Sequence, residues 1–535
     1  MLQYSLLNDG LFNVKLPTSG EAASLSLPQV LARLSEGQDL TFTSLRPHQA
    51  PAWHAFLVQL AYLAVESDES FILPLAEDAW AIRLRRLTEE FTDDSPWFLM
   101  NSDWQRPAFM QAPSPLGRES DFKRLDKSAQ AIDVLVTSRN HDEKAEKLSL
   151  NDQSLDCLIY ALVSVQGWTK QDGQGRYFSM RINGGYASRP QFRLAYERGS
   201  GQEFLRDLRA LDEGAGADLE AASKVGFGTA DHRPHVLLWT VVWGDTQLTI
   251  QDIHPYCLEV CRKVRLISAG GRLVLRGATS SGNRVAAEDF KGCVFDPWTP
   301  VERTEPPKAL NAQPHTLNYA RLQELMFDAT KAKLPLLAKP SELERRRNLP
   351  ATLIARALVG GNGKTNGFLQ KELQIPPGVL SRVDTAGKEL AIRSSSFVRL
   401  AAHAEGDILR GALQRFVSGG GREKYKYAEY GQTIDPFIER FKQQIDDAFF
   451  GVLFATIESE PDDLQAQRCW ANWLERALRH QHEIAMSVLP TRERSRFFAQ
   501  DRSRHFLNQG LRKHFGSLYA ATGLPIVSNS KHTDV

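Results

Sequence analysis

The first two-thirds of the chain alternate apolar segments with polar, glycine-containing turns. Residues 51–67 place apolar side chains at helical spacing and predict a helix with one broad apolar face, with Pro51 in its first turn. Residues 156–168 predict a buried helix that ends at Gly167. Short β-branched and aromatic runs bounded by glycines predict strands at 172–194, 235–243, 271–279 and 292–302. This order indicates an α+β fold with antiparallel pieces, not a repeated βαβ unit.

From about residue 389 the pattern becomes wholly helical. Apolar residues recur three and four positions apart in the segments 394–417, 434–458, 462–488 and 496–523. The serines at 394–396 suit the N-cap of the first segment. Short connections between such helices are typical of an antiparallel four-helix bundle. We therefore expect two domains, a large mixed α+β domain over residues 1–388 and a bundle over residues 389–535.

Composition narrows the possible partners. The 535 residues include 65 Lys and Arg against 64 Asp and Glu, a net charge of +1. Contact with nucleic acid must therefore come from local patches, which argues against a free-standing, non-specific DNA binder. The five cysteines are irregularly spaced, which favours free thiols in a reducing compartment. No signal peptide and no stretch of membrane-spanning length stands out, so we expect a cytoplasmic protein without membrane contact.

The stretch "LVGGNGKTNG", residues 358–367, raises the possibility of nucleotide binding. Gly363, Lys364 and Thr365 match the end of a P-loop, G-x-x-x-x-G-K-[ST]. However, Leu358 stands where the first glycine of that motif is required. The apolar residues at 353, 354, 357 and 358 also predict a helix over 350–359, whereas a P-loop follows a strand. A P-loop-like enzyme that binds a nucleoside triphosphate remains the alternative, and a polar loop that approaches a ligand is favoured.

Motifs for catalysis are missing from the sequence. It contains no G-x-S-x-G elbow, no H-E-x-x-H and no paired C-x-x-C. The pair His141-Asp142 resembles part of a metal phosphohydrolase site, but no further ligands accompany it, and a polar loop explains it equally well. We therefore predict no enzymatic activity, no cofactor and no metal.

Basic residues gather in several short loops. Arg181, Arg189 and Arg193 surround the segment Asn183 to Tyr186, and its glycines permit close backbone approach to a phosphate or groove. Others lie in 284–291 and 422–426 and along the last helix. Each alone is also compatible with a solvated face. Together, on a neutral chain, they suggest that a polyanion is contacted at separated points.

The order of motifs resembles the CasA family, the large subunit of the type I-E CRISPR surveillance complex Cascade. The resemblance is carried, in order, by "RPHQAPAWHAFLVQLAYLA", "PAFMQ", "DVLVTSRNHDEK", "RINGGYASRP", "FDPWTPV" and "ALVGGNGKTNG", followed by the helical C-terminal part. It covers most of the chain.

The resemblance implies a non-catalytic subunit that recognises the protospacer-adjacent motif (PAM) in double-stranded target DNA. The family reads this motif mainly from the minor groove and helps to open the duplex, so that guide RNA pairs with the target strand and an R-loop forms. Implied partners are the other Cascade subunits, the guide RNA, the target duplex and an effector nuclease-helicase that the complex recruits. The bundle resembles the family's C-terminal domain.

The resemblance also implies roles for particular residues. The wedge that enters the duplex beneath the PAM would comprise Gly363, Lys364, Thr365 and Asn366. Many relatives carry Gln where Asn366 stands. The glycine loop at the PAM would comprise Asn183, Gly184, Gly185 and Tyr186. Arg284 and Lys291 are the two alternatives for a basic finger. The loop near the guide-RNA 5′ end and the PAM would contain the contact residues Arg139, Asn140, His141 and Lys144.

Overall fold

The computed structural model describes most of the chain in two compact units. The described residues are 4–17, 19–68, 70–118, 122, 124–128, 154–168, 189–244, 246–269, 272–278, 284–361, 364–419, 427–459, 462–491 and 496–520. The first unit comprises Met1–Leu317 and Thr330–Gln374, and the second comprises Asn318–Ala329 and Ile375–Val535. The expected domain boundary between residues 388 and 389 lies within a helix of the second unit.

Helix α2 (Ala50–Val65) forms the centre of the first unit. It contacts α3 (Glu77–Arg86), α5 (Leu155–Gly167), α6 (Ser200–Lys224) and the strand β8 (Ile253–Leu258). The predicted single apolar face is wrong, because nearly every residue of α2 is buried and the helix is covered on all sides. The predicted buried helix that ends at Gly167 is confirmed as α5.

Aromatic side chains hold α2 against its neighbours. The Trp53 ring lies 5.3 Å from that of Phe56, 5.1 Å from that of Tyr160 on α5 and 5.2 Å from that of Phe12, measured between centroids. Each large ring removed from water contributes roughly 1.5–3 kcal/mol of transfer free energy. The shorter helix α1 (Leu27–Ser35) begins with a capping box in which Ser26 and Gln29 satisfy each other's backbone amides, and it packs on α3 and α6.

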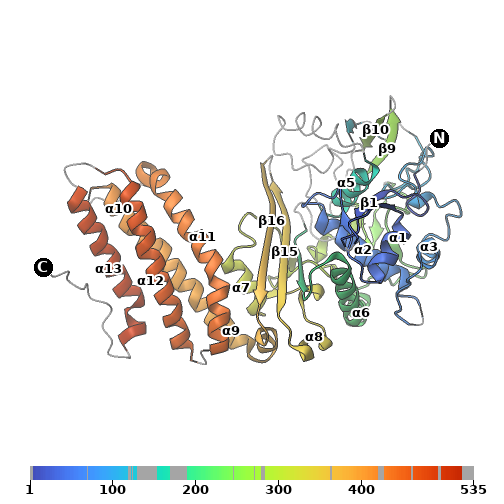
Figure 1. The fold of residues 1–535 in the computed structure, drawn as a ribbon. Helices are drawn as coiled ribbons and strands as arrows, with labels where there is room; N and C mark the ends of the chain where they lie inside the picture. Colours follow the sequence, from blue (N-terminus) through green and yellow to red (C-terminus); the bar gives the residue numbers. More distant parts are fainter. Residues whose placement is uncertain are drawn as a thin grey trace. The chain divides into compact units, whose positions relative to one another are not determined.

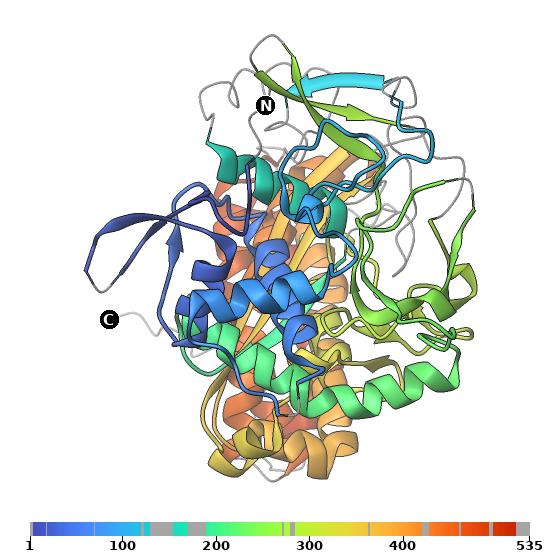
Figure 2. The same cartoon turned by 90° about the vertical axis from the view of Figure 1, so that its right-hand side faces the viewer.

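Small sheets surround these helices. Three-stranded sheets have the orders β2-β1-β3 (Ala22–Leu25, Phe12–Lys15, Thr41–Phe42), β4-β10-β9 (Arg124–Ser128, Arg272–Gly277, Val264–Ala269) and β13-β12-β14 (Lys308–Ala309, Val301–Glu302, Ala332–Lys333). Their pairings are antiparallel, and the β4-β10-β9 sheet lies at one end of the unit (Figure 2). Parallel pairs join β6 (His235–Leu237) to β8 and β7 (Leu248–Thr249) to β11 (Val285–Ala286). The predicted α+β class is confirmed.

Two predicted strands are longer than the observed ones. The run 235–243 is a strand only over β6, because the chain then turns and buries Trp239 and Trp243 as side chains of the core. Within 292–302 only β12 is a strand. Aromatic residues that fill a core from a turn have the same composition as a strand, so composition alone does not separate the two.

The second unit is a helical bundle, as predicted (Figure 1). Its elements are α7 (Tyr319–Phe327), α9 (Val379–Ala402), the π-helical segment η7 (His403–Arg410), α10 (Gly411–Val417), α11 (Tyr427–Ser459), α12 (Asp463–Val488) and α13 (Arg496–Ala520). The predicted N-cap at residues 394–396 is wrong. The helix begins at Val379, and Ser394 is buried inside it, where its hydroxyl donates to Oε1 of Gln323 at 2.8 Å.

Within the described residues, no helix is both long enough and apolar enough to cross a membrane. All five cysteines are free, as expected.

Candidate nucleic-acid interface

A long β-hairpin carries the glycine-rich stretch. Strands β15 (Ala351–Gly361) and β16 (Lys364–Ile375) lie side by side, and β5 (Gln191–Ala195) completes a sheet of order β16-β15-β5 (Figure 1). Strand β5 pairs antiparallel with β15 from Thr352↔Ala195 to Arg356↔Gln191. The predicted helix over 350–359 is therefore wrong.

The apolar spacing that predicts a helix has a different cause here. Strand β15 is the middle strand of its sheet and is buried on both faces, so that residues 351–359 are all buried except the half-buried Arg356. Strands of this kind are continuous apolar runs without alternation, and a run of this length fits a helix equally well. Leu358 joins the main core, whereas Ala357 and Val359 pack against Ala312 on the opposite face.

The hairpin continues beyond the strand that anchors it. The last pair with β5 is at Arg356, and β15 runs on to Gly361, about 16 Å further at a rise of roughly 3.3 Å per residue. Lys364, Thr365 and Asn366 are the first residues of β16. The structure thus brings these three predicted wedge residues together at the tip.

Gly367 is a feature of the tip that the sequence analysis missed. Its φ is +86°, and apart from its two chain neighbours no described residue has an atom within 4 Å of the place where a Cβ would stand. A left-handed residue inside a strand changes the local twist, and glycine adopts this conformation without steric cost. A glycine within a strand pattern indicates such a local change of backbone conformation and is the sequence signal that could have identified Gly367.

The β5 strand enters this sheet at the end from which the hairpin continues. Because β5 and β15 are antiparallel and Gln191 pairs with Arg356, the chain enters β5 from the side toward Gly361. The described chain there begins at Arg189, which forms an ion pair with the buried Asp296. Asp296 also accepts hydrogen bonds from the Trp298 amide at 2.9 Å and the Thr299 hydroxyl at 2.8 Å.

Arg189 and Arg193 are structural ions, not the solvated basic face suggested by the sequence. Arg193 is 4% exposed and forms ion pairs with Glu203 and with Asp207, the latter at 3.1 Å. His54 Nε2 lies 2.8 Å from the same Asp207 carboxylate. Burial alone would raise the pKa of Asp207, but Arg193, His54 and Arg206 outweigh it and lower that pKa to about 2. The network therefore keeps Asp207 ionised and holds β5 on α6.

The two residues proposed for a basic finger have different environments. Arg284 is buried, and its Nη2 donates to the carbonyl oxygens of Leu238 at 2.6 Å and Val241 at 2.7 Å. Its guanidinium also lies 4.4 Å from the centre of the Trp243 ring. Burial lowers the pKa of Arg284 to about 9. The side chain of Lys291 is exposed, which leaves it as the candidate that can reach DNA.

Lys291 is linked to the hairpin through one short segment. Its carbonyl oxygen accepts a hydrogen bond from the Ala309 amide at 3.0 Å, and Ala312, three residues on, packs against Ala357 and Val359 of β15.

The other predicted contact residues lie outside the described part of the chain. These are Gly363, the glycine-loop residues Asn183, Gly184, Gly185 and Tyr186, and the guide-proximal residues Arg139, Asn140, His141 and Lys144.

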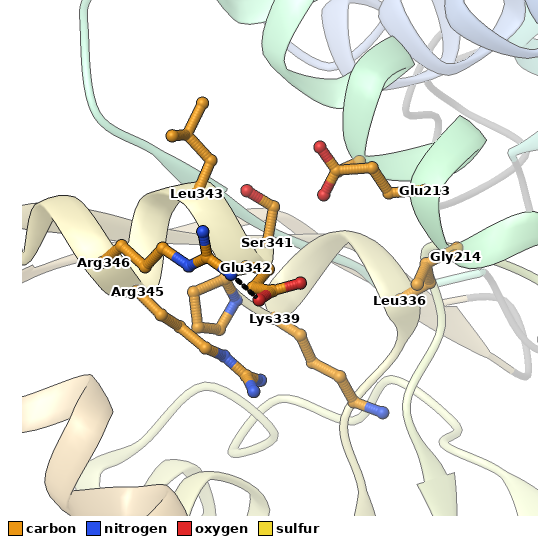
Figure 3. Close-up of a pocket in the computed structure, with 11 residues that line it drawn as sticks. Glu213, Gly214, Leu336, Lys339, Ser341, Glu342, Leu343, Arg345 and Arg346 are labelled. Atoms are coloured by element: carbon orange, nitrogen blue, oxygen red, sulfur yellow. Dashed lines mark hydrogen bonds and ion pairs between the residues drawn. The ribbon is translucent and has the colours of Figure 1, made fainter.

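An open pocket of about 760 Å³ lies elsewhere in the first unit, between α6, η6 (Leu336–Ala338) and α8 (Glu342–Arg347) (Figure 3). Its wall combines the carboxylates Glu213 and Glu342 with the cations of Lys339, Arg345 and Arg346. Arg346 is already paired with Glu342. This mixed lining favours no single class of ligand.

The observed hairpin also bears on the nucleotide-binding alternative. A strand does precede the Gly-Lys-Thr triplet, contrary to the prediction, but another strand follows it. A P-loop needs a helix at that point, because the helix N-terminus and the backbone amides around it hold the phosphates. The geometry therefore disfavours a P-loop on grounds that do not depend on Leu358.

A mixed α+β unit with a long hairpin, together with a helical bundle, is the architecture of CRISPR-associated proteins of the Cse1 or CasA type. Cse1 from Acidimicrobium ferrooxidans matches with a TM-score of 0.61 and 15% identity over 97% of this chain and 99% of that one. Cse1 from Thermobifida fusca matches at 0.60 and 14% over 96% and 98%, and CasA from Thermus thermophilus at 0.59 and 14% over 96% and 100%. No family model and no curated protein matches the chain. The chain thus has the Cse1/CasA fold that the motif order predicts.

Proposed function

We propose that this chain is the large subunit of a type I-E Cascade complex and that its β15–β16 hairpin opens target DNA beside the PAM. The observation that carries the proposal is the projecting hairpin with Lys364, Thr365 and Asn366 after its turn, within a chain of Cse1/CasA fold. Residues 1–388 would serve PAM recognition, and the bundle would contact other subunits. The subunit has no catalytic step of its own and licenses recruitment of a nuclease-helicase.

Energetics support a wedge built in this way. Unstacking a base-pair step costs roughly 0.6–2.2 kcal/mol, so a few well-placed contacts can offset the opening of two or three steps. A loop can hold strands apart only if it is itself held rigidly. Here the central strand is buried on both faces and is anchored by β5, which Arg193 and Asp207 fix in the core.

The glycine loop and the basic finger complete the proposed interface. Asn183, Gly184, Gly185 and Tyr186 lie upstream of Arg189, where the chain enters the sheet on the hairpin-tip side. Backbone amides at glycines approach a minor-groove floor closely, and the degenerate code of that groove suits a permissive PAM. We assign the basic finger to Lys291 and the guide-proximal contacts to Arg139, Asn140, His141 and Lys144.

The test is R-loop formation by the assembled, guide-loaded complex on a supercoiled plasmid with a matched target. The double variant Lys364→Ala, Asn366→Ala is expected to slow R-loop formation by roughly tenfold or more, the equivalent of about 1.4 kcal/mol in the barrier. Its matched control is Lys388→Ala with Gln251→Ala, which removes one exposed lysine and one exposed amide outside the hairpin. Equal rates for the hairpin variant, the control and the wild type would refute the wedge.

A binding measurement distinguishes the proposed DNA wedge from the alternative, a site for a nucleoside triphosphate. Equilibrium dialysis of the full chain with labelled ATP and Mg²⁺ is expected to show no binding. Saturable binding that Lys364→Ala abolishes would replace the wedge by a nucleotide site.

A further inference from the structure

Three metal-ligating side chains meet within the second unit. His403 and Asp407 lie on η7, and His514 lies on α13. His403 Nδ1 is 2.6 Å from Asp407 Oδ2, and His514 Nε2 is 3.7 Å from the same oxygen. The three ligand atoms all lie within 4.8 Å of one another, and the two imidazole centroids are 4.2 Å apart. Among the described residues, these three side chains form the group whose ligand atoms are close enough to bind one metal ion together.

The local fold explains why these residues meet. A Cβ on Gly510 would lie 3.0 Å from the Ile408 side chain, and a Cβ on Gly411 would lie 2.4 Å from the Phe506 ring. These two glycines therefore leave room for side chains of the facing segment where α13 packs on η7 and α10. His514 is one turn after Gly510 and therefore lies on the same face of α13. Because Gly510 faces Ile408, His514 lies beside Asp407, the residue before Ile408. A π-helical segment such as η7 is unusual and is frequent at functional sites.

We propose that His403, Asp407 and His514 bind one divalent transition-metal ion, with Zn²⁺ as the favoured occupant, and that the ion clamps α13 to η7. Two imidazole nitrogens and one carboxylate oxygen are the ligand set of tetrahedral zinc sites that keep a fourth position open for water. Alkaline-earth ions prefer oxygen ligands and are disfavoured by the imidazoles.

The geometry needs only small adjustments to hold the ion. Ligand atoms about 2.0–2.1 Å from a tetrahedral centre lie roughly 3.3 Å apart, between the observed 2.6 and 3.7 Å. The carboxylate of Asp407 is 56% exposed, so it can rotate without disturbing the core, whereas His514 is 13% exposed and held in place.

Neighbouring groups shift the pKa values of two of the three side chains. The hydrogen bond from His403 is the largest cause that lowers the pKa of Asp407. Burial, followed by the neighbouring His403, lowers the pKa of His514. Lys513 is the nearby opposing charge, since it interacts with both Asp407 and His514.

Metal titration of the purified, metal-stripped full chain tests this proposal. Zn²⁺ is titrated against a chromophoric chelator, and Co²⁺ is used in parallel because four-coordinate cobalt absorbs strongly in the visible range. We expect one ion per chain, the intense cobalt bands, and an upward shift of the unfolding temperature that follows the free metal concentration.

Variants decide whether these three residues are the ligands. His403→Ala, His514→Ala and Asp407→Asn are expected to weaken zinc binding by roughly tenfold or more each and to remove the cobalt bands. His480→Ala and His505→Ala, which alter exposed histidines of the same unit, are expected to bind as the wild type does. Far-UV circular dichroism confirms that each variant is helical, and Asp407→Asn tests the site even if a histidine variant unfolds. Stoichiometric binding that survives in the triad variants, or no binding by the wild type at micromolar zinc, would overturn the proposal.

Discussion

The guanidinium of Arg193 on β5 lies 3.1 Å from the carboxylate of Asp207 on α6, and both side chains are enclosed in the core of the first unit. Arg206 donates to the other carboxylate oxygen at 3.0 Å, so Asp207 is the carboxylate that these two cations share, while Arg193 also pairs with Glu203 and Arg206 with Glu344. Desolvated charges of this kind are tolerated only while their partners are present.

We expect Asp207→Asn to destabilise the first unit by about 3–5 kcal/mol, because two buried guanidinium groups lose the carboxylate that they share. Urea unfolding followed by tryptophan fluorescence measures the change. The stabilising effect of Asp207 also has a defined pH range, since its folded pKa of about 2 is below the ordinary 3.8. Its contribution is complete above about pH 4 and is lost as the pH falls toward 2.

The exposed pair Lys224–Glu220 on α6 supplies the control, because its partners are 70% and 69% exposed. Glu220→Gln should leave the unfolding midpoint almost unchanged. If Asp207→Asn behaved like this control, the network would not be what anchors β5.

Gly367 should be sensitive to any side chain, although no described residue beyond its chain neighbours lies within 4 Å of its Cβ position. Gly367→Ala is expected to cost about 1–2 kcal/mol, because the φ of +86° is unfavourable for an L-residue. In the assembled complex we also expect slower R-loop formation, since the substituted residue follows the proposed tip directly. Denaturant unfolding and the R-loop assay are the two measurements.

The exposed Gly216 in α6 is the matched control for this substitution, since nothing lies within 4 Å of its Cβ position and its conformation is helical. Gly216→Ala should stabilise the protein by roughly 0.5–1 kcal/mol. Equal effects of the two substitutions would mean that the conformation of Gly367 carries no strain.

Arg284 and Lys291 should separate cleanly into a structural and a surface residue. Arg284→Ala is expected to destabilise the unit by about 2–4 kcal/mol, because the carbonyl groups of Leu238 and Val241 lose their donor and Trp243 loses its packed cation. Lys291→Ala should leave stability unchanged, weaken binding to PAM-containing duplex and reduce the salt dependence of that binding. The reverse pattern would assign the basic finger to Arg284.

The contrast between Arg284 and Lys291 shows where sequence reasoning reaches its limit. Both residues are basic and lie in a loop, and only the long-range carbonyl partners of Arg284 decide that it is buried. Likewise, the helical spacing of Leu353 and Leu358 arises because β15 is covered on both faces, which depends on β5 from about 160 residues earlier in the chain. By contrast, α5 was predictable, because a long apolar run that ends at a glycine is informative by itself.

The order of motifs predicted more of the fold than any single pattern. Each short stretch has several local explanations, whereas their succession from residue 46 to residue 367 leaves few folds, and the structure confirms the one that it indicates. Which basic residues are available for contact was not deducible in the same way, because Arg189 and Arg193 have the composition of a contact loop but serve as internal ions.

The last prediction concerns Glu66 and His254, whose carboxylate and imidazole lie 3.4 Å apart. The short distance suggests an ion pair, but burial raises the pKa of Glu66 to about 7 and lowers that of His254 to about 4, so both groups are neutral between these values. A raised carboxyl pKa stabilises the fold fully below 4.5, and this contribution is lost as the pH rises through 7. The lowered pKa of His254 acts in the opposite sense, since its contribution is complete above 6.5 and is lost as the pH falls toward 4.

Glu66→Gln removes only the first of these two effects. The variant should therefore gain stability over the wild type as the pH rises from 5 to 8, by about 2 kcal/mol at the upper end. Urea midpoints at four pH values across this range measure the difference, with Glu220→Gln as the exposed control. If Glu66 and His254 instead formed an ion pair, Glu66→Gln would be the less stable protein near pH 6, and the difference would shrink as His254 loses its proton.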